Sequence, residues 1–217
     1  MSRTQRLAAA MAHLPLVAIL RGLRPHEAEE IGLTLEAAGF ALVEVPLNSP
    51  QPFDSIAALR RVLRPETLVG AGTVTRVEDV QRLHDLGADL VVMPHADTAV
   101  IRAAKAAGML CVPGVATPTE AFAAIAAGAD ALKLFPAELV THGVMKAMRA
   151  VLPPQVPLLP VGGITPASLA PWRAAGAKGF GLGSALYSPG LAVDAVAANA
   201  ADFVRAWRAC VGPPPAS

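Results

Sequence analysis

A lysine stands in the middle of an apolar run, in Leu132-Lys133-Leu134-Phe135-Pro136. The run is typical of a β-strand, where an ammonium ion is costly to bury unless it is paired or neutral. Glu44 stands in a similar place, in "LVEVPL". A desolvated lysine loses part of its proton affinity and can attack a carbonyl carbon, and a nearby carboxylate can move the protons that imine formation requires. We therefore predict that Lys133 and Glu44 are catalytic.

Two structural alternatives explain the same two charges without chemistry. Glu44 and Lys133 could form a buried salt bridge, although such pairs add little net stability once their desolvation is counted. Lys133 could also extend its long stem and bring its ammonium group to the rim. All three interpretations stay open at the level of the residues.

Arg21 and Thr73 follow two other apolar runs directly. Arg21, in "AILRG", could supply a second cation beside the lysine or bind a substrate carboxylate through two hydrogen bonds; a salt bridge at the rim is the alternative. "GAGT" at 70–73 combines two glycines with the hydroxyl of Thr73, so its backbone could approach a small ligand closely.

Glycines cluster in "VGGIT" at 161–165 and in "GLGSAL" at 181–186. Backbone N–H groups at Gly162, Gly163 and Gly183 can surround an anion, and Ser184 can donate its hydroxyl or cap a helix that opens there. In a (β/α)8 barrel the loops after strands 7 and 8 often bind phosphate. Ordinary tight turns would also use glycine, but clusters in both loops favour a phosphate site.

No metal or cofactor is expected. The histidines show no paired ligand spacing, and only His95 lies just beyond a predicted strand; the full set is His13, His26, His84, His95 and His142. The chain also has no Rossmann or Walker fingerprint for a nucleotide.

Eight short apolar runs must position these residues. They lie at 16–20, 42–47, 68–72, 90–94, 109–114, 131–136, 157–163 and 179–184. Ala- and Leu-rich segments with helical spacing separate them, and five of these segments end in a glycine suited to a left-handed C-cap: "EAAGF", "HDLGAD", "KAAGM", "IAAGAD" and "RAAGAK". Continuous apolar strands alternating with helices indicate a parallel α/β sheet that is covered on both faces.

Eight such units favour a (β/α)8 TIM barrel over an open doubly wound sheet, which commonly has five or six strands. Residues 1–217 are expected to form a single domain, with a short amphipathic helix at 1–13 and a frayed tail at 211–217. If alternate strands fill the same layers of the lumen, the second and sixth runs would let Glu44 and Lys133 approach each other across the barrel.

Composition limits the class of protein. Of the 217 residues 53% are hydrophobic and 16% are charged, which supplies a large core and argues against disorder. The net charge of +1 makes nucleic acid and anionic membranes poor candidates for partners. Cys111 and Cys210 form no disulfide framework, so we expect a reduced, cytoplasmic compartment, and no apolar segment is long enough to span a membrane.

Seven motifs in fixed order resemble the class I 2-keto-3-deoxy-6-phosphogluconate/6-phosphogalactonate aldolases over about residues 14–190: "AILRG", "VEVPLNSP", "GAGTV", "PGVATPTEA", "ALKLFPA", "PVGGIT" and "GLGSALY". The resemblance implies a homotrimer of metal-free (β/α)8 barrels. It also implies cleavage of a phosphorylated keto-deoxy sugar acid to pyruvate and glyceraldehyde 3-phosphate.

The same resemblance implies roles for individual residues. Lys133 would be the Schiff-base lysine, and Glu44 the general acid/base that acts through a water in imine formation and on the C4 hydroxyl during cleavage. Arg21 and Thr73 would hold the pyruvyl carboxylate of the substrate. Its phosphate would be held by Gly162, Gly163, Gly183 and Ser184. Pro94 and Phe135 would form walls of the pocket.

Two positions favour the galactonate branch of the family. "EVPLNSP" carries Asn48 where the gluconate branch typically has an arginine, and Val161 stands where that branch tends to have a hydroxyl residue. The expected substrate is therefore 2-dehydro-3-deoxy-6-phosphogalactonate, with its 6-phosphogluconate epimer as the alternative. The remaining rivals are a phospho-sugar epimerase or isomerase with His95 as an essential acid/base group, and a non-catalytic phospho-sugar sensor.

Overall fold

The computed structural model describes residues 1–211. Its strands are β1 (Leu16–Ile19), β2 (Leu42–Pro46), β3 (Leu68–Gly72), β4 (Leu90–Val92), β5 (Leu110–Val112), β6 (Gly114–Val115), β7 (Leu132–Leu134), β8 (Leu158–Pro160) and β9 (Phe180–Leu182). The helices are α1 (Arg3–His13), α2 (Pro25–Ala37), α3 (Pro52–Val62), α4 (Val77–Asp85), α5 (Thr98–Ala106), α6 (Pro118–Ala126), α7 (His142–Val151), the 3-10 helix η1 (Pro166–Ser168), α8 (Leu169–Ala174) and α9 (Val193–Val211).

All paired strands are parallel, which confirms the predicted α/β class. One sheet has the order β5-β4-β3-β2-β1-β9 and the other the order β6-β7-β8. Each strand from β1 to β4 pairs with the next one in the chain, and β9 returns to pair with β1. A doubly wound sheet would reverse its direction of growth at a central strand, so this order contradicts that alternative.

Hydrogen bonds join the two sheets on both sides. Between β5 and β7, the amide of Asp130 donates to the carbonyl of Cys111, and the amide of Lys133 donates to Pro113. Between β8 and β9, Lys178 donates to Leu158, and Val161 forms a parallel bridge with Gly181. Pro113 has no N–H to give to a neighbouring strand, and it divides the fifth predicted run into β5 and β6.

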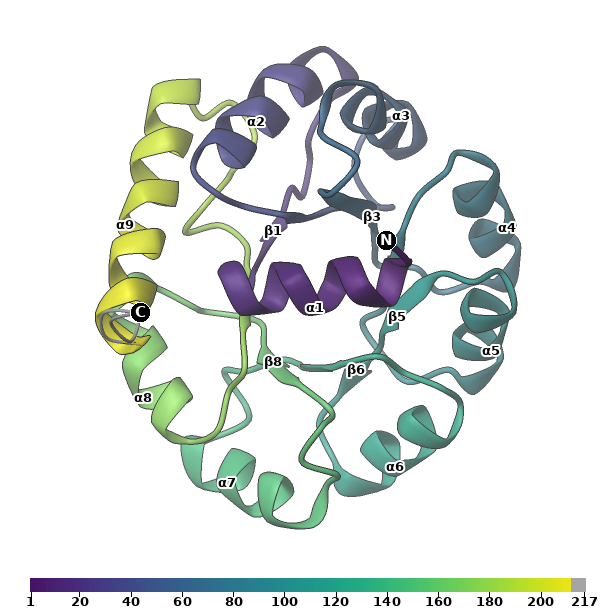
Figure 1. Ribbon diagram of the computed structural model, residues 1–217, viewed down its shortest axis with the longest axis vertical. Helices are drawn as coiled ribbons and strands as arrows, with labels where there is room; N and C mark the ends of the chain where they lie inside the picture. Colours follow the sequence, from purple (N-terminus) through teal and green to yellow (C-terminus); the bar gives the residue numbers. More distant parts are fainter. Residues whose placement is uncertain (212–217) are drawn as a thin grey trace.

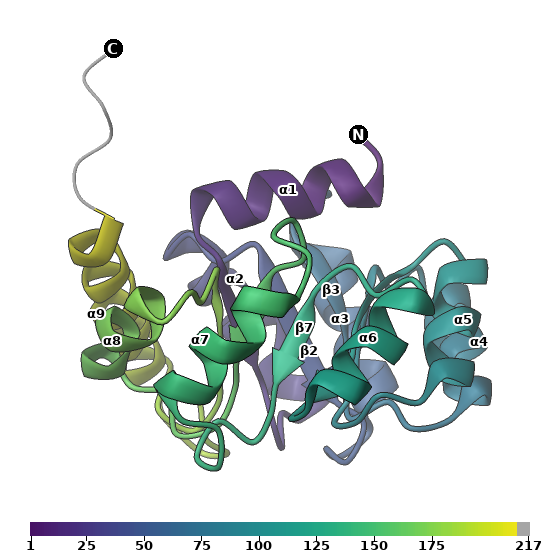
Figure 2. The same ribbon diagram turned by 90° about the horizontal axis from the view of Figure 1, so that it is seen from below.

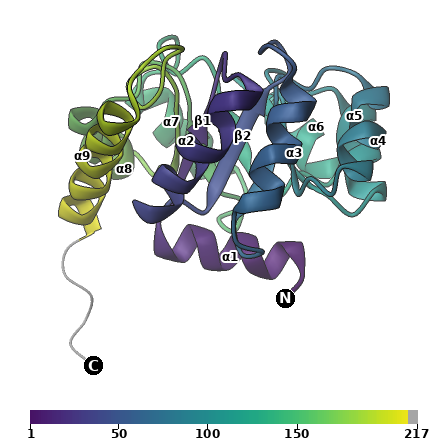
Figure 3. The ribbon, with the colours of Figure 1, turned by 90° about the horizontal axis from the view of Figure 1, so that it is seen from above.

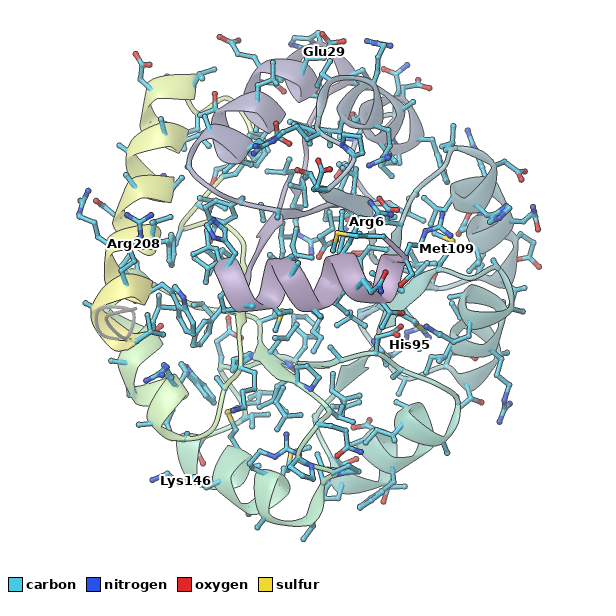
Figure 4. The ribbon with its side chains drawn as sticks, in the orientation of Figure 1. Arg6, Glu29, His95, Met109, Lys146 and Arg208 are labelled. Atoms are coloured by element: carbon cyan, nitrogen blue, oxygen red, sulfur yellow. The ribbon has the colours of Figure 1, made fainter. Side chains whose placement is uncertain are left out.

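Helices α2 to α9 form a ring outside the strands, and α1 crosses the middle of that ring (Figure 1). Figure 4 shows Glu29, Lys146 and Arg208 on the outer side of the ring, whereas Arg6, a residue of α1, lies inside it. The five predicted C-cap glycines, Gly39, Gly87, Gly108, Gly128 and Gly176, all have positive φ, so this prediction is confirmed.

Side chains alternate between two hydrophobic layers. In β2, Val43 and Val45 pack under the helices, while Leu42 packs in an inner cluster with Val17, Leu68 and other lumen residues. In β7, Leu132 and Leu134 join the outer layer, and Ala131, directly before the strand, joins the inner one. This period of two sends Glu44 and Lys133 into the space that the strands enclose.

The ends of the chain differ from the sequence prediction in detail. Residue 211 is the last residue of α9, and the rest of the predicted frayed tail, 212–217, lies outside the described residues. In residues 1–211 no helix combines the length and the apolar character that crossing a membrane requires.

Candidate active site

Glu44 and Lys133 are both buried and line one internal cavity. Their exposed fractions are 1% and 5%, although both are ionisable. The cavity has a volume of about 30 Å³, and its other lining residues are apolar or glycine. Lys133 is therefore not at the surface, which contradicts the alternative of a lysine that reaches the rim.

The two side chains alter each other's ionisation. Burial raises the pKa of Glu44 above its ordinary 4.5, while the charges of Lys133 and Arg21 oppose that rise. Burial lowers the pKa of Lys133 below its ordinary 10.5; Arg21 lowers it further, and Glu44 acts in the opposite direction. The environment thus shifts Lys133 toward the neutral amine, which is the nucleophilic form of lysine.

Glu44 and Lys133 do not form a closed salt bridge. Within the described residues the pair has no N···O approach of 4.0 Å or less, and Oε2 of Glu44 has no hydrogen-bond partner. A purely structural ion pair would need those contacts to offset the cost of desolvation. An acceptor that is buried and unpartnered is instead suited to taking a proton from a bound molecule.

Phe135 lies between this cavity and a second, more open pocket. Its ring centroid is 4.7 Å from Nζ of Lys133, and its side chain lines the second pocket. Ile19 and Val161 line both spaces. The amine therefore lies beneath a wall of Ile19, Phe135 and Val161, with the second pocket on the other side.

The second pocket gathers most of the residues predicted to bind substrate. It has a volume of about 270 Å³, and its lining includes Arg21, Phe135, Val161, Gly162, Gly163, Gly183 and Ser184. Gly162 and Gly163 have φ values of 114° and 61°, which side-chain-bearing residues rarely adopt. Residues 184–186 form a turn, so Ser184 does not open the short helix that we expected there.

Glu138 occupies part of this pocket and was missed by the sequence analysis. A methyl group placed on Gly162 would lie 2.2 Å from Oε2 of Glu138, so the carboxylate packs directly on the glycine backbone. Its position just after the strand that carries Lys133, in "FPAE", was the available signal. A negative charge at a predicted phosphate site has to move or be screened when a phosphate binds.

Arg21 is exposed at the mouth of the pocket, where it is held by the loop after β2. Its Nη1 donates to Oδ1 of Asn48 at 2.8 Å, and the backbone amide of Gly22 donates to Oγ of Ser49 at 2.9 Å. Arg21 thus bonds to an amide oxygen and not to a rim carboxylate. Asn48 fixes one side of the guanidinium and leaves its other donors for a ligand.

Thr73 and Pro94 are not among the residues that line either space. Thr73 is half-buried at the end of β3, with a φ of 54°. The carbonyl carbon and oxygen of Pro94 lie about 2.6 Å from where a methyl group on Gly114 would be, and Gly114 is the strand neighbour of Lys133. The backbone of Pro94 therefore packs on Gly114, the residue paired with Lys133, while binding roles for Thr73 and Pro94 stay predictions.

In the part of the chain that the structure describes, no three His, Cys, Asp or Glu side chains gather as a metal site would require. His95, which the epimerase alternative needs as an acid/base group, is exposed. It does not line the cavity that holds Glu44 and Lys133.

The family described as "KDPG and KHG aldolase" matches residues 7–201. The chain belongs to the KDPG and KHG aldolase family. It is 48% identical over 199 residues to the 2-dehydro-3-deoxy-6-phosphogalactonate aldolase of Escherichia coli K12, covering 91% of this chain and 97% of that one. It is 46% identical over 198 residues to a probable 2-dehydro-3-deoxy-6-phosphogalactonate aldolase of Rhizobium meliloti strain 1021, covering 91% and 93% of the two chains.

A solved structure titled "Native KDPGal structure" superimposes with a TM-score of 0.90 at 47% identity, covering 91% of this chain and 96% of that one. The predicted membership of this aldolase family is confirmed, and with it the class of enzyme, a carbon–carbon lyase.

Proposed function

We propose that the protein cleaves 2-dehydro-3-deoxy-6-phospho-D-galactonate to pyruvate and D-glyceraldehyde 3-phosphate through a Schiff base on Lys133. One observation carries the proposal: a buried lysine with a lowered pKa shares a cavity with a buried, unpartnered glutamate. The similarity to galactonate-branch relatives at 46% and 48% identity supports the choice of substrate.

In the first stage the neutral Nζ of Lys133 attacks the C2 carbonyl carbon of the substrate. The nitrogen gives up one proton. The carbonyl oxygen takes up that proton and a second one from the protonated carboxyl group of Glu44 and leaves as water, so that a protonated imine forms. Glu44 relays the first proton and supplies the second, because burial raises the pKa of its carboxyl group and so favours the protonated form more than in an exposed glutamate.

In the second stage Glu44 accepts the proton of the C4 hydroxyl. The C3–C4 bond breaks, its electron pair moves toward the imine, and a neutral enamine remains on Lys133 while glyceraldehyde 3-phosphate leaves. Glu44 returns the proton to C3. Addition of water to the resulting protonated imine releases pyruvate and restores the amine, and the proton set free in this step returns to Glu44. The imine is essential because it accepts an electron pair that C3 could not hold as a carbanion.

The residues around the second pocket would hold the two charged ends of the substrate, the carboxylate and the phosphate. Arg21 at its mouth would hold the pyruvyl carboxylate together with Thr73, with Pro94 and Phe135 as walls. The backbone at Gly162, Gly163 and Gly183 and the hydroxyl of Ser184 would hold the phosphate. Val161, which lines both spaces, would give an apolar surface to the carbon atoms that lie between these ends.

We also propose that the two hydrogen-bonded sheets act as one closed (β/α)8 barrel within a single domain. The bonds at both seams support closure. A homotrimeric assembly and a cytoplasmic location stay predictions from the family resemblance and the cysteine content.

Reduction of the imine tests the proposed function. Borohydride added with pyruvate should inactivate the protein irreversibly and add the mass of a reduced pyruvyl group at Lys133, located by peptide mass spectrometry. Folded protein that forms no such adduct would defeat the Schiff-base mechanism. Rates of cleavage of the two C4 epimers then test the sugar, and faster cleavage of the gluconate epimer would overturn the galactonate proposal.

A further inference from the structure

Helix α1 lies across one end of the strands and closes the space that they enclose. Figures 2 and 3 show it spanning that end of the molecule, directly before β1 begins. Two of its side chains, Leu7 and Met11, line the internal cavity whose wall also contains Glu44 and Lys133. Ala10, on the same side of the helix, is 4% exposed. One face of α1 is thus the floor of the cavity that holds the amine.

Arginine side chains fasten α1 to the strand ends. Arg3 and Arg6 both form ion pairs with Asp89, which is 2% exposed and also pairs with Arg60 of α3. The other donors of Arg3 and Arg6 reach backbone carbonyls of Ala88, Gly108 and Pro65. An anchor that uses several charged hydrogen bonds from one turn of helix holds the floor in a single position.

We propose that Leu7 and Met11 are positioning residues for catalysis: they exclude water from the lumen beneath Lys133 and so keep its amine in the neutral, nucleophilic form. This inference rests on the Schiff-base function proposed above and extends it to a helix at the opposite end of the strands from Arg21.

Leu7 and Met11 can affect Lys133 because they form part of the apolar surroundings that lower the pKa of its amine. Two charged groups act on Lys133: Glu44 from β2 raises its pKa, and Arg21 after β1 lowers it. Burial has a larger effect than either charge, and it lowers the pKa. Apart from Glu44 and Lys133, the lining of the cavity is apolar or glycine. The apolar floor offers a water molecule no hydrogen-bond partner, whereas a polar group added to it would help water to bind beneath the amine. Water beneath the amine would solvate the ammonium form and raise the pKa of Lys133.

The test compares four variants of the full chain. Met11→Gln and Leu7→Gln keep the approximate size of each side chain but place an amide in the cavity wall. Met11→Leu keeps the wall apolar, and Ala8→Gln places the same amide on the exposed side of α1. For each protein, the rate at which pyruvate and cyanoborohydride label Lys133 is measured by intact mass across the pH range, with circular dichroism as the check of folding.

In Met11→Gln and Leu7→Gln, the pH of half-maximal labelling should rise by about one unit, with labelling about tenfold slower at neutral pH. Met11→Leu and Ala8→Gln should keep the wild-type profile. Folded Gln variants with the wild-type profile overturn the role of α1, since a structural role alone would lower the melting temperature without moving the profile. If either Gln variant does not fold, the other one decides. Failure of the wild-type protein to label would instead overturn the Schiff-base function itself.

Discussion

The carboxylate of Glu44 lies over Gly72, in the space that a side chain at residue 72 would fill. A methyl group on Gly72 would be 1.4 Å from Oε2 of Glu44 and 2.4 Å from its carboxyl carbon. The two residues stand on neighbouring strands, β2 and β3, where Gly72 pairs with Pro46. Glycine at this position is therefore what allows the carboxylate to reach its place beside Lys133.

Substituting Gly72 should disable the enzyme through Glu44. In Gly72→Ala the new methyl group must push the carboxylate away, so turnover should fall at least about a hundredfold, the usual contribution of a general acid/base. Gly143→Ala is the matched control, because Gly143 is exposed in α7 and a methyl group there meets only the hydroxyl of Thr141 at 3.6 Å. Activity in Gly72→Ala close to that of the control would show that the position of Glu44 is unimportant.

Removing the charge of Glu44 should move the titration of Lys133 to lower pH. Glu44 raises the pKa of Lys133. In Glu44→Gln that effect is lost, and burial and Arg21, which both lower the pKa, remain. Labelling by pyruvate and cyanoborohydride should reach half its maximum at a lower pH than in the wild type, while turnover of the sugar acid falls about a hundredfold or more. A profile shifted toward higher pH, or full turnover, would contradict the role given to Glu44.

Glu138 should weaken the binding of phosphorylated substrate. Its carboxylate packs on Gly162 inside the proposed phosphate pocket, and like charges repel. Glu138→Gln keeps the shape of the side chain, so KM for the phosphorylated sugar acid should fall about fivefold while labelling by pyruvate alone is unchanged. Glu30→Gln, an exposed change on α2, is the control for net charge. A rise in KM would mean that the carboxylate contributes to substrate binding.

The two cysteines should differ in their reactivity. Burial raises the pKa of Cys111 to about 12, and its side chain is fully buried, whereas Cys210 is partly exposed. The thiolate is the reactive form, so iodoacetamide at pH 8 should alkylate Cys210 and leave Cys111 unmodified in the folded protein. Peptide mass spectrometry measures both sites, and denatured protein, in which both react, is the control. Early modification of Cys111 would contradict its burial.

Local patterns in the sequence accounted for much of the fold. The apolar runs predicted the strands to within a few residues, and the "AAG"-type endings predicted left-handed glycines such as Gly39 and Gly128. Both signals act over a few residues, because strand periodicity and helix capping depend on neighbours along the chain. The fifth run was the exception, since Pro113 interrupts its hydrogen bonding and divides it into β5 and β6.

The sequence by itself determined the parallel α/β class, through apolar runs that alternate with helical segments, and the aldolase family, through seven motifs in fixed order. It also predicted Lys133 and Glu44 as the two reactive groups, since each is a charge inside an apolar strand. Only the tertiary structure decided that these groups share one cavity with an otherwise apolar lining, that α1 forms its floor and that Glu138 enters the pocket beyond. The reason is physical: burial and proximity arise when the curved sheets bring distant strands together, and no pattern along the chain records the distance between two side chains on different strands.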